Sequence, residues 1–155
     1  MYKFIFILIL FTNCTNYSVS KNRIVAPILI SITKVTNGHN VKVRVTNQEP
    51  FLAGYKLYTA PNESTARNPA DLTAGTDCSS ALTILPNQPL EYSFDVTATP
   101  STISPSGTNR LCIFNINLTS GNYIAIRGLL LSIQPSNQTG NRVNPSLPSN
   151  SLLVP

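Results

Sequence analysis

Short runs in which apolar and polar residues alternate are the feature that most constrains this chain. Val41, Val43 and Val45 alternate with Lys42 and Arg44, and successive side chains of an extended strand point to opposite faces. Similar short runs recur along the chain, separated by Gly, Pro, Asn and Ser, and helical periodicity is almost absent. The pattern predicts an all-β fold built from short strands.

Seven strands are expected, with turns and polar loops between them. The first two form a hairpin around the Asn37-Gly38 pair, a dipeptide favoured in tight β-turns. Ile28, Ile30 and Ile32 are expected to share one face of the first strand. The predicted strands cover residues 28–33, 41–45, 53–59, 81–85, 90–96, 111–118 and 123–133.

Two polar stretches and a tail interrupt the strand pattern. Residues 60–80 are rich in Pro, Asn, Thr and Ala, and a loop of this length is often functional or mobile. Residues 97–109 form a second polar loop. Residues 135–155 carry one charge, at Arg142, and are expected to be an extended, weakly ordered tail. Its apolar patch at 152–154 is too short to predict docking.

The strand spacing resembles that of immunoglobulin-like and fibronectin type III domains. Residues 54–58 (GYKLY) resemble the third strand of a fibronectin type III domain, and the Leu-Pro pair at 85–86 followed by Tyr92 resembles its tyrosine corner. The resemblance implies a seven-stranded antiparallel β-sandwich over residues 24–134, although the signature tryptophan is absent. If Tyr92 is the corner tyrosine, residues 90–96 are the sixth strand instead of the fifth, so the sheet assignment of the later strands stays open.

The N-terminal segment is typical of an exported protein. Residues 4–11 (FIFILILF) are an unbroken apolar run that follows a positive charge at Lys3. A membrane-spanning helix needs about 20 apolar residues, so this run matches the apolar region of a secretory signal instead.

Cys14 follows the apolar run closely. The segment LFTNC at 10–14 resembles a lipobox, and its relaxed form, with Phe11 and Asn13, is similar to that of spirochaete lipoproteins. The resemblance implies that Cys14 is lipidated, with residues 1–13 as the signal peptide and residues 14–23 as a tether. The alternative is ordinary cleavage after residue 20, which would discard Cys14.

The other two cysteines, Cys78 and Cys112, form an even pair in a domain expected outside the reducing cytosol. A bridge between them would close a loop of about 34 residues and stabilise the fold by roughly 3–4 kcal/mol in the chain-entropy model. The alternative is a pair of buried thiols that do not meet. Neither cysteine has a CxxC partner, so no zinc site is expected.

The residues that carry most enzyme chemistry are scarce. The single histidine, His39, lies beside the hairpin turn and is expected in solvent instead of acting as a general base. Glu91 and Asp95 would lie about 13 Å apart along one strand, farther than the carboxyl pair of a glycosidase. No nucleotide, metal or cofactor motif occurs, and the scattered cations do not form the basic stripe of a nucleic-acid-binding protein.

One sheet face is a candidate interaction surface. If the strands at 53–59, 111–118 and 123–133 share a sheet, its inward residues are Tyr55, Leu57, Phe114, Ile116, Ile124 and Ile126. The outward residues are then Lys56, Tyr58, Asn115, Asn117, Tyr123 and Arg127. Tyr and Arg are enriched at interface hot spots, which predicts a partner-binding face. The alternative is an ordinary solvated face.

Together these features predict a non-enzymatic lipoprotein, held in the inner or outer membrane of the cell envelope and facing the periplasm or the cell surface. Its sandwich would serve as a binding or structural module, with an unidentified protein as the partner. The alternatives are a lipid-anchored enzyme or enzyme accessory with an unrecognised site, and a plainly secreted interaction domain.

Overall fold

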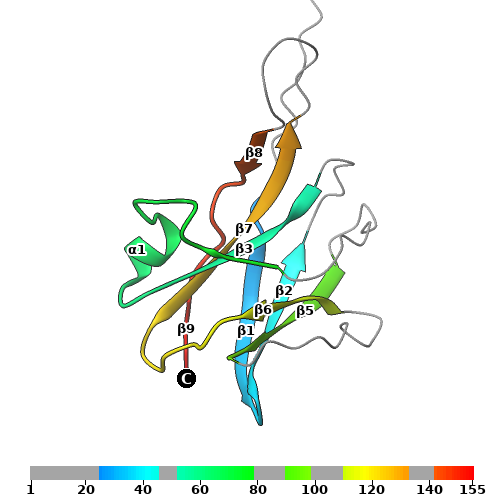
Figure 1. The fold of residues 1–155 in the computed structure, drawn as a ribbon. Helices are drawn as coiled ribbons and strands as arrows, with labels where there is room; N and C mark the ends of the chain where they lie inside the picture. The colour runs from blue at the N-terminus through cyan, green and yellow to red at the C-terminus, as the bar shows by residue number, and fades with distance from the viewer. Residues whose placement is uncertain (1–24, 46–51, 79–89, 99–109, 133–141) are drawn as a thin grey trace, which may run out of the picture.

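The structure is a computed structural model that describes residues 25–45, 52–78, 90–98, 110–132 and 142–155. Two β-sheets lie against each other around one shared core (Figure 1). The elements are β1 (Ile28–Val35), β2 (Gly38–Val45), β3 (Leu52–Ala60), α1 (Glu63–Arg67), β4 (Thr76–Asp77), β5 (Leu90–Thr97), β6 (Arg110–Asn115), β7 (Tyr123–Ser132), β8 (Arg142–Pro145) and β9 (Leu152–Leu153). The predicted signal peptide, Cys14, the tether before residue 25 and the predicted strand at 81–85 lie outside the described residues.

The first sheet has the strand order β1-β2-β5-β6, and the second has the order β4-β3-β7-β8, with β9 also paired to β7. The all-β prediction is confirmed, but the expectation of a purely antiparallel sandwich is wrong, because β5 and β6 are parallel. Parallel neighbours need a crossover of about a dozen residues, and residues 98–109 supply that length.

The hairpin of β1 and β2 forms as predicted, with Val35 paired to Gly38. Gly38 has φ +150°, and a Cβ at this position would collide with the carbonyl oxygen of Val96, so a side chain would be excluded from this turn. Val41, Val43 and Val45 are buried and the two cations between them are exposed. This confirms the alternation expected for β2.

The prediction that Ile28, Ile30 and Ile32 share one face of β1 is wrong. Leu29 is buried, whereas Ile28 and Ile30 are exposed. The pairing with β2 shifts between Leu29 and Ser31, and a β-bulge of this kind changes which side chains face the core. After the bulge, Ile32 packs against the core, so it lies on the opposite face of β1 from Ile28 and Ile30.

The core between the sheets is built around three aromatic rings. Phe94 contacts Tyr55 and Phe114 in edge-to-face geometry, each with ring centroids 5.2 Å apart. Such pairs add about 0.5–1.5 kcal/mol beyond the burial of their area. The six residues predicted to point inward from the strands at 53–59, 111–118 and 123–133 belong to this core or pack against it, although Phe114 and Ile116 reach it from the first sheet and the segment after β6.

The C-terminal segment departs from the prediction of a weakly ordered tail. Residues 142–155 form β8 and β9 along β7, and Val154 is 1% exposed. Between these strands, Ser146 and Ser149 bond to β7 through both their backbone N–H groups and their hydroxyls. The domain therefore extends beyond residue 134, and residues 142–155 belong to it.

Candidate functional site

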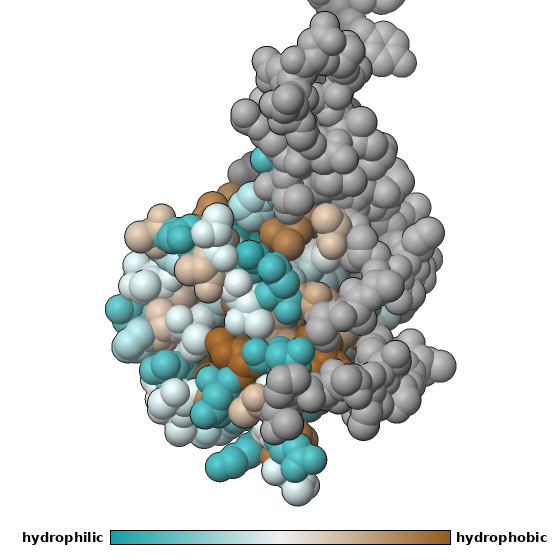
Figure 2. Space-filling model, viewed as in Figure 1, coloured by the Kyte–Doolittle hydropathy of each residue, from teal (hydrophilic) through white to brown (hydrophobic). Residues whose placement is uncertain are grey.

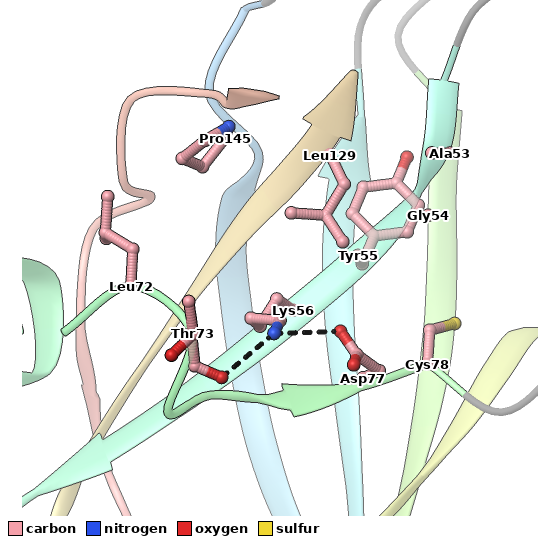
Figure 3. A pocket seen from close by; sticks show the side chains of 10 residues that line it. All are labelled: Ala53, Gly54, Tyr55, Lys56, Leu72, Thr73, Asp77, Cys78, Leu129 and Pro145. Carbon is pink, nitrogen blue, oxygen red and sulfur yellow. Dashed lines mark hydrogen bonds and ion pairs between the residues drawn. The ribbon is translucent and has the colours of Figure 1, made fainter. Parts of the chain in front are cut away.

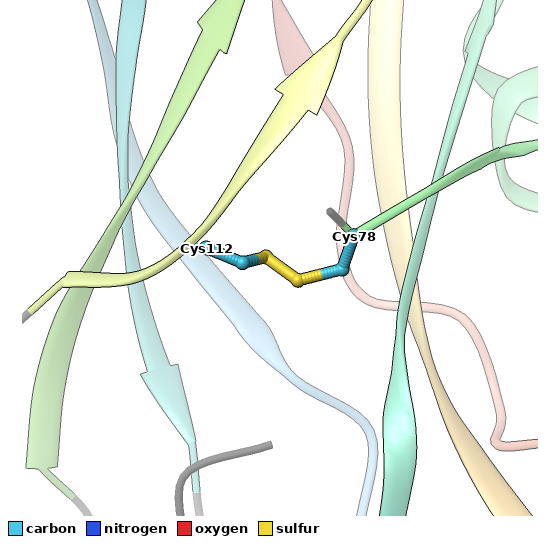
Figure 4. Close-up of a disulfide and its surroundings, with 2 residues drawn as sticks. All are labelled: Cys78 and Cys112. Carbon is cyan, nitrogen blue, oxygen red and sulfur yellow. A yellow bond between two sulfur atoms is a disulfide. The ribbon is translucent and has the colours of Figure 1, made fainter. Parts of the chain in front are cut away.

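A disulfide joins Cys78, which directly follows β4, to Cys112 in β6 (Figure 4). Their Cα atoms are 5.7 Å apart and the residues are 34 positions apart in sequence. Because β4 belongs to the second sheet and β6 to the first, the bridge ties the two sheets together on one side. The predicted pairing of Cys78 with Cys112 is confirmed.

A groove of about 420 Å³ lies beside this disulfide, on the outer side of the second sheet (Figure 3). Gly54 has φ +142°, and a Cβ there would have no neighbour within 4 Å, so the groove stays open where other residues would place a side chain. The lining residues are Ala53, Gly54, Tyr55, Lys56, Leu72, Thr73, Asp77, Cys78, Leu129 and Pro145.

The polar end of the groove is an ion pair that is held in place. The Lys56 Nζ atom lies 3.2 Å from Asp77 Oδ1 and donates to the carbonyl oxygen of Thr73 at 3.1 Å. The Lys56 side chain is 13% exposed and that of Asp77 is 67% exposed, so the carboxylate is the group that solvent or a ligand reaches more easily. Leu72, Leu129 and Pro145 provide apolar walls.

The predicted partner-binding face does not form. Tyr58 and Arg127 are only 4% and 8% exposed. Asn115 and Asn117 are exposed, but Asn115 lies in β6 of the first sheet and Asn117 follows β6 outside both sheets, whereas Lys56, Tyr58 and Arg127 lie in the second sheet. The expectation failed because the sequence pattern did not show that β6 pairs with β5, nor that another segment covers this face.

The segment that covers the face consists of α1 and residues 68–75. Tyr58 donates its hydroxyl proton to the Leu72 carbonyl at 2.8 Å. The guanidinium of Arg127 donates to the carbonyl oxygens of Arg67 at 2.6 Å and Ser146 at 2.7 Å. Its pKa is lowered by burial. Arg127 thus ties α1 and the C-terminal segment to β7 instead of meeting a partner.

The sequence carries a signal for α1 that the strand pattern concealed. The Asn62 side chain accepts from the N–H of Thr65 at 2.8 Å and caps the helix, and Glu63 follows in the first turn, as expected of a helix start. Ala66 packs with Ala60 and Ala125 against the outer side of the sheet, beside Tyr123. Much of residues 60–78, which were predicted to belong to a long polar loop, is therefore folded and covers the outer side of the second sheet.

His39 is buried at 8% exposure, which contradicts its predicted place in solvent. Burial lowers the pKa of its imidazole, and the nearby Lys34 lowers it further. It lines a second hollow, of about 300 Å³, at the hairpin end of the domain, with Lys34, Asn117 and Leu118 among its neighbours. Its Nε2 atom is buried without a hydrogen-bond partner among the described residues.

Among the side chains that the structure describes, the other charged groups are exposed or half-buried. Arg44 pairs with Glu91 at 2.7 Å, and Asn40 donates to Asp95 at 2.9 Å. In the described part of the chain, no three His, Cys, Asp or Glu residues gather as metal ligands, and no helix has the length and apolarity to cross a membrane. The face in Figure 2 mixes hydrophilic and near-neutral residues with small, separate hydrophobic areas.

No protein-family model, curated protein or solved structure matches this chain. The fold and the site therefore define only a class: an all-β protein of two packed sheets, linked by a disulfide, with a groove on the outer side of one sheet.

Proposed function

We propose that this protein is a non-enzymatic lipoprotein of the cell envelope, anchored in the inner or outer membrane through Cys14. The observation that carries the proposal is the disulfide between Cys78 and Cys112, because disulfides persist in oxidising compartments outside the cytosol. The apolar run at 4–11 just before Cys14 supports the same compartment. The domain would then act at the periplasmic or outer side of the membrane as a binding or structural module.

The domain itself is proposed to be immunoglobulin-like or fibronectin type III-like. In immunoglobulin domains one sheet holds strands A, B, E and D and the other holds C, F and G. The order β1-β2-β5 supports A-B-E, and the order β3-β7-β8 supports C-F-G. β6 then takes the place next to E that strand D normally occupies. In this assignment Tyr92 lies in strand E, which does not favour it as the corner tyrosine.

The groove beside Lys56 is the binding surface that this proposal favours. Ligand sites combine apolar walls with a few placed polar groups. Leu72, Leu129 and Pro145 provide the walls, and the Lys56–Asp77 pair provides the polar end. These features favour a ligand with an apolar body and one polar or cationic end that reaches Asp77.

Labelling of cells with radioactive palmitate tests the anchor. The wild-type protein and a Cys112→Ser variant should both incorporate label and fractionate with membranes, because both keep Cys14, the proposed lipidation site. A Cys14→Ser variant should incorporate none. Mass spectrometry of the mature wild-type protein should show a diacylated N-terminal Cys14. A mature N-terminus at Lys21, or label retained in Cys14→Ser, would overturn the proposal.

A further inference from the structure

Three exposed aliphatic side chains lie within six consecutive residues where the described domain begins. Val25, Ile28 and Ile30 are 47%, 50% and 39% exposed. Scattered surface aliphatics are ordinary, but clustered ones mark sites of interaction with a protein or a membrane. We call these three residues the N-terminal strip.

The backbone of β1 imposes this exposure. Leu29 fills the core at 3% exposure, so the alternation of the strand places its neighbours Ile28 and Ile30 outside. Ile28 pairs across the strands with Arg44, which is exposed on the same side of the sheet. The exposure of Ile28 and Ile30 is therefore set by the geometry of the strand.

The edge of β1 beside the strip is not open to another strand. Leu29 donates its backbone N–H to Asn150 Oδ1 at 2.8 Å, and its carbonyl oxygen accepts from Asn150 Nδ2 at 2.9 Å. A second copy that extended the sheet at this point would need both backbone groups of Leu29. The strip therefore presents exposed apolar side chains beside a strand edge whose Leu29 backbone groups are already bonded to Asn150. This favours a fluid apolar partner over a second strand.

The length of chain before the strip points to the same partner. Val25 follows Cys14 by 11 residues, so even a fully extended tether keeps the strip within roughly 40 Å of the anchored cysteine. Lys42 is exposed, pairs across the strands with Ser31 beside the bulge, and forms no salt bridge among the described residues. Such a cation is attracted to anionic lipid headgroups.

We propose that the N-terminal strip rests on the lipid bilayer, with Val25, Ile28 and Ile30 in its interfacial region and Lys42 among the headgroups. This inference rests on the proposed function, because the lipid on Cys14 is what holds the strip at the membrane. It assigns a fixed orientation to the domain, with the start of β1 toward the bilayer.

The test uses the full-length lipidated protein in vesicles of phosphatidylethanolamine and phosphatidylglycerol. Ile30→Cys introduces a single free thiol, since Cys78 and Cys112 are bonded, and this thiol carries an environment-sensitive fluorophore. Val35→Cys is the matched control, because Val35 is 47% exposed on the same strand and lies about 17 Å farther along it. Both positions are exposed, so both labelled proteins should keep the wild-type melting temperature.

Nitroxide lipids should quench the label at position 30 at least threefold more than the label at position 35. Adding Val25→Ser and Ile28→Ser to the Ile30→Cys protein should lower its quenching toward the control level. Equal quenching at positions 30 and 35 overturns the inference, as does self-quenching without nitroxide lipid, which would indicate a second copy. Mass spectrometry of the same sample separates the two proposals: an unmodified Cys14 removes both, whereas a lipidated Cys14 with equal quenching removes only the orientation.

Discussion

The side-chain amide of Asn150 pairs with the backbone of Leu29 as a neighbouring strand would. Asn150 Oδ1 accepts from the Leu29 N–H at 2.8 Å, and Asn150 Nδ2 donates to the Leu29 carbonyl at 2.9 Å. Just after Asn150, β9 pairs with β7 in the second sheet. The C-terminal segment therefore joins both sheets on the side of the domain formed by β1 and β7.

Asn150→Ala should lower the free energy of unfolding by about 1–3 kcal/mol, because it removes two hydrogen bonds and leaves Leu29 groups without protein partners. Asn150→Asp should also destabilise, since a carboxylate cannot donate to the Leu29 carbonyl. Urea denaturation measures both changes, and amide exchange at Leu29 should become faster. Asn144→Ala, at an exposed asparagine of β8, is the matched control and should change stability by less than about 0.5 kcal/mol. Equal effects at both positions would contradict this role of Asn150.

Removing the disulfide should cost roughly 3–4 kcal/mol, the chain-entropy value for cysteines 34 positions apart. The double variant Cys78→Ala/Cys112→Ala is the cleaner measurement, since it leaves no reactive thiol. Denaturant titration of the oxidised wild type and the double variant gives the difference. Alkylation of the unreduced, denatured wild type should modify neither Cys78 nor Cys112, and two modified thiols at these positions would contradict the bond.

Arg127→Met should loosen α1 more than the core. The substitution removes the donors to the Arg67 and Ser146 carbonyls, and each buried carbonyl left unpaired costs about 1–3 kcal/mol. Amide exchange at Ala66 and Asn68, whose N–H groups form bonds within and at the end of the helix, should become faster.

Arg127→Lys should not restore this protection, because a single ammonium group lacks the planar fork that reaches several acceptors. Arg44→Met is the control, since Arg44 forms an exposed pair with Glu91 that is worth about 0–1 kcal/mol. Unchanged amide exchange at Ala66 in Arg127→Met would show that the hydrogen bonds of Arg127 are not needed to hold α1 in place.

His39 should make the stability of the protein depend on pH on the acid side of the ordinary imidazole pKa. Burial, and then Lys34, lower its pKa in the folded state below the ordinary value of 6.5, so the unfolded chain binds a proton that the folded protein does not. The free energy of unfolding should therefore fall as the pH drops below about 6.5. The lowered pKa of Asp71, caused by hydrogen bonds from Thr73, acts only at lower pH.

His39→Gln should abolish this part of the pH dependence, as measured by urea denaturation at pH 8 and pH 5. Lys34→Gln should reduce it without abolishing it, because burial is the larger cause of the shift. If wild type and His39→Gln lose the same stability between the two pH values, the imidazole is not the group responsible.

The local pattern of the chain was enough to predict several features. Alternation in β2 predicted which valines are buried, because the two faces of a strand differ in their exposure to water whatever lies beyond them. The Asn37-Gly38 pair predicted the hairpin, because the turn depends on backbone preferences of its own residues. The pairing of Cys78 with Cys112 was predicted because they are the two cysteines that remain once Cys14 is set aside, in a domain expected to lie outside the reducing cytosol.

The candidate site was not predictable in the same way. Alternation correctly placed Tyr58 and Arg127 on the outer side of the second sheet, but it carries no information about what lies above that side. Their burial depends on hydrogen bonds to the backbone carbonyls of Leu72, Arg67 and Ser146. These residues lie in polar, proline-rich segments, whose sequence does not indicate that they pack against the sheet. The groove likewise arises from the open position at Gly54 and the arrangement of β4 and β8 around it.

The strands and the hairpin follow from the amino acids themselves, because each depends on neighbours in sequence. The pairing of Cys78 with Cys112 could be predicted from composition, although the two residues are 34 positions apart. The pairing of β6 with β5, the burial of Arg127 and the docking of residues 142–155 were settled by folding in three dimensions. In each case, backbone or polar groups must find hydrogen-bond partners far away in sequence. Hydrophobic periodicity indicates which face of a strand points toward the core. It does not indicate which distant residue forms hydrogen bonds with the backbone groups at the edge of that strand.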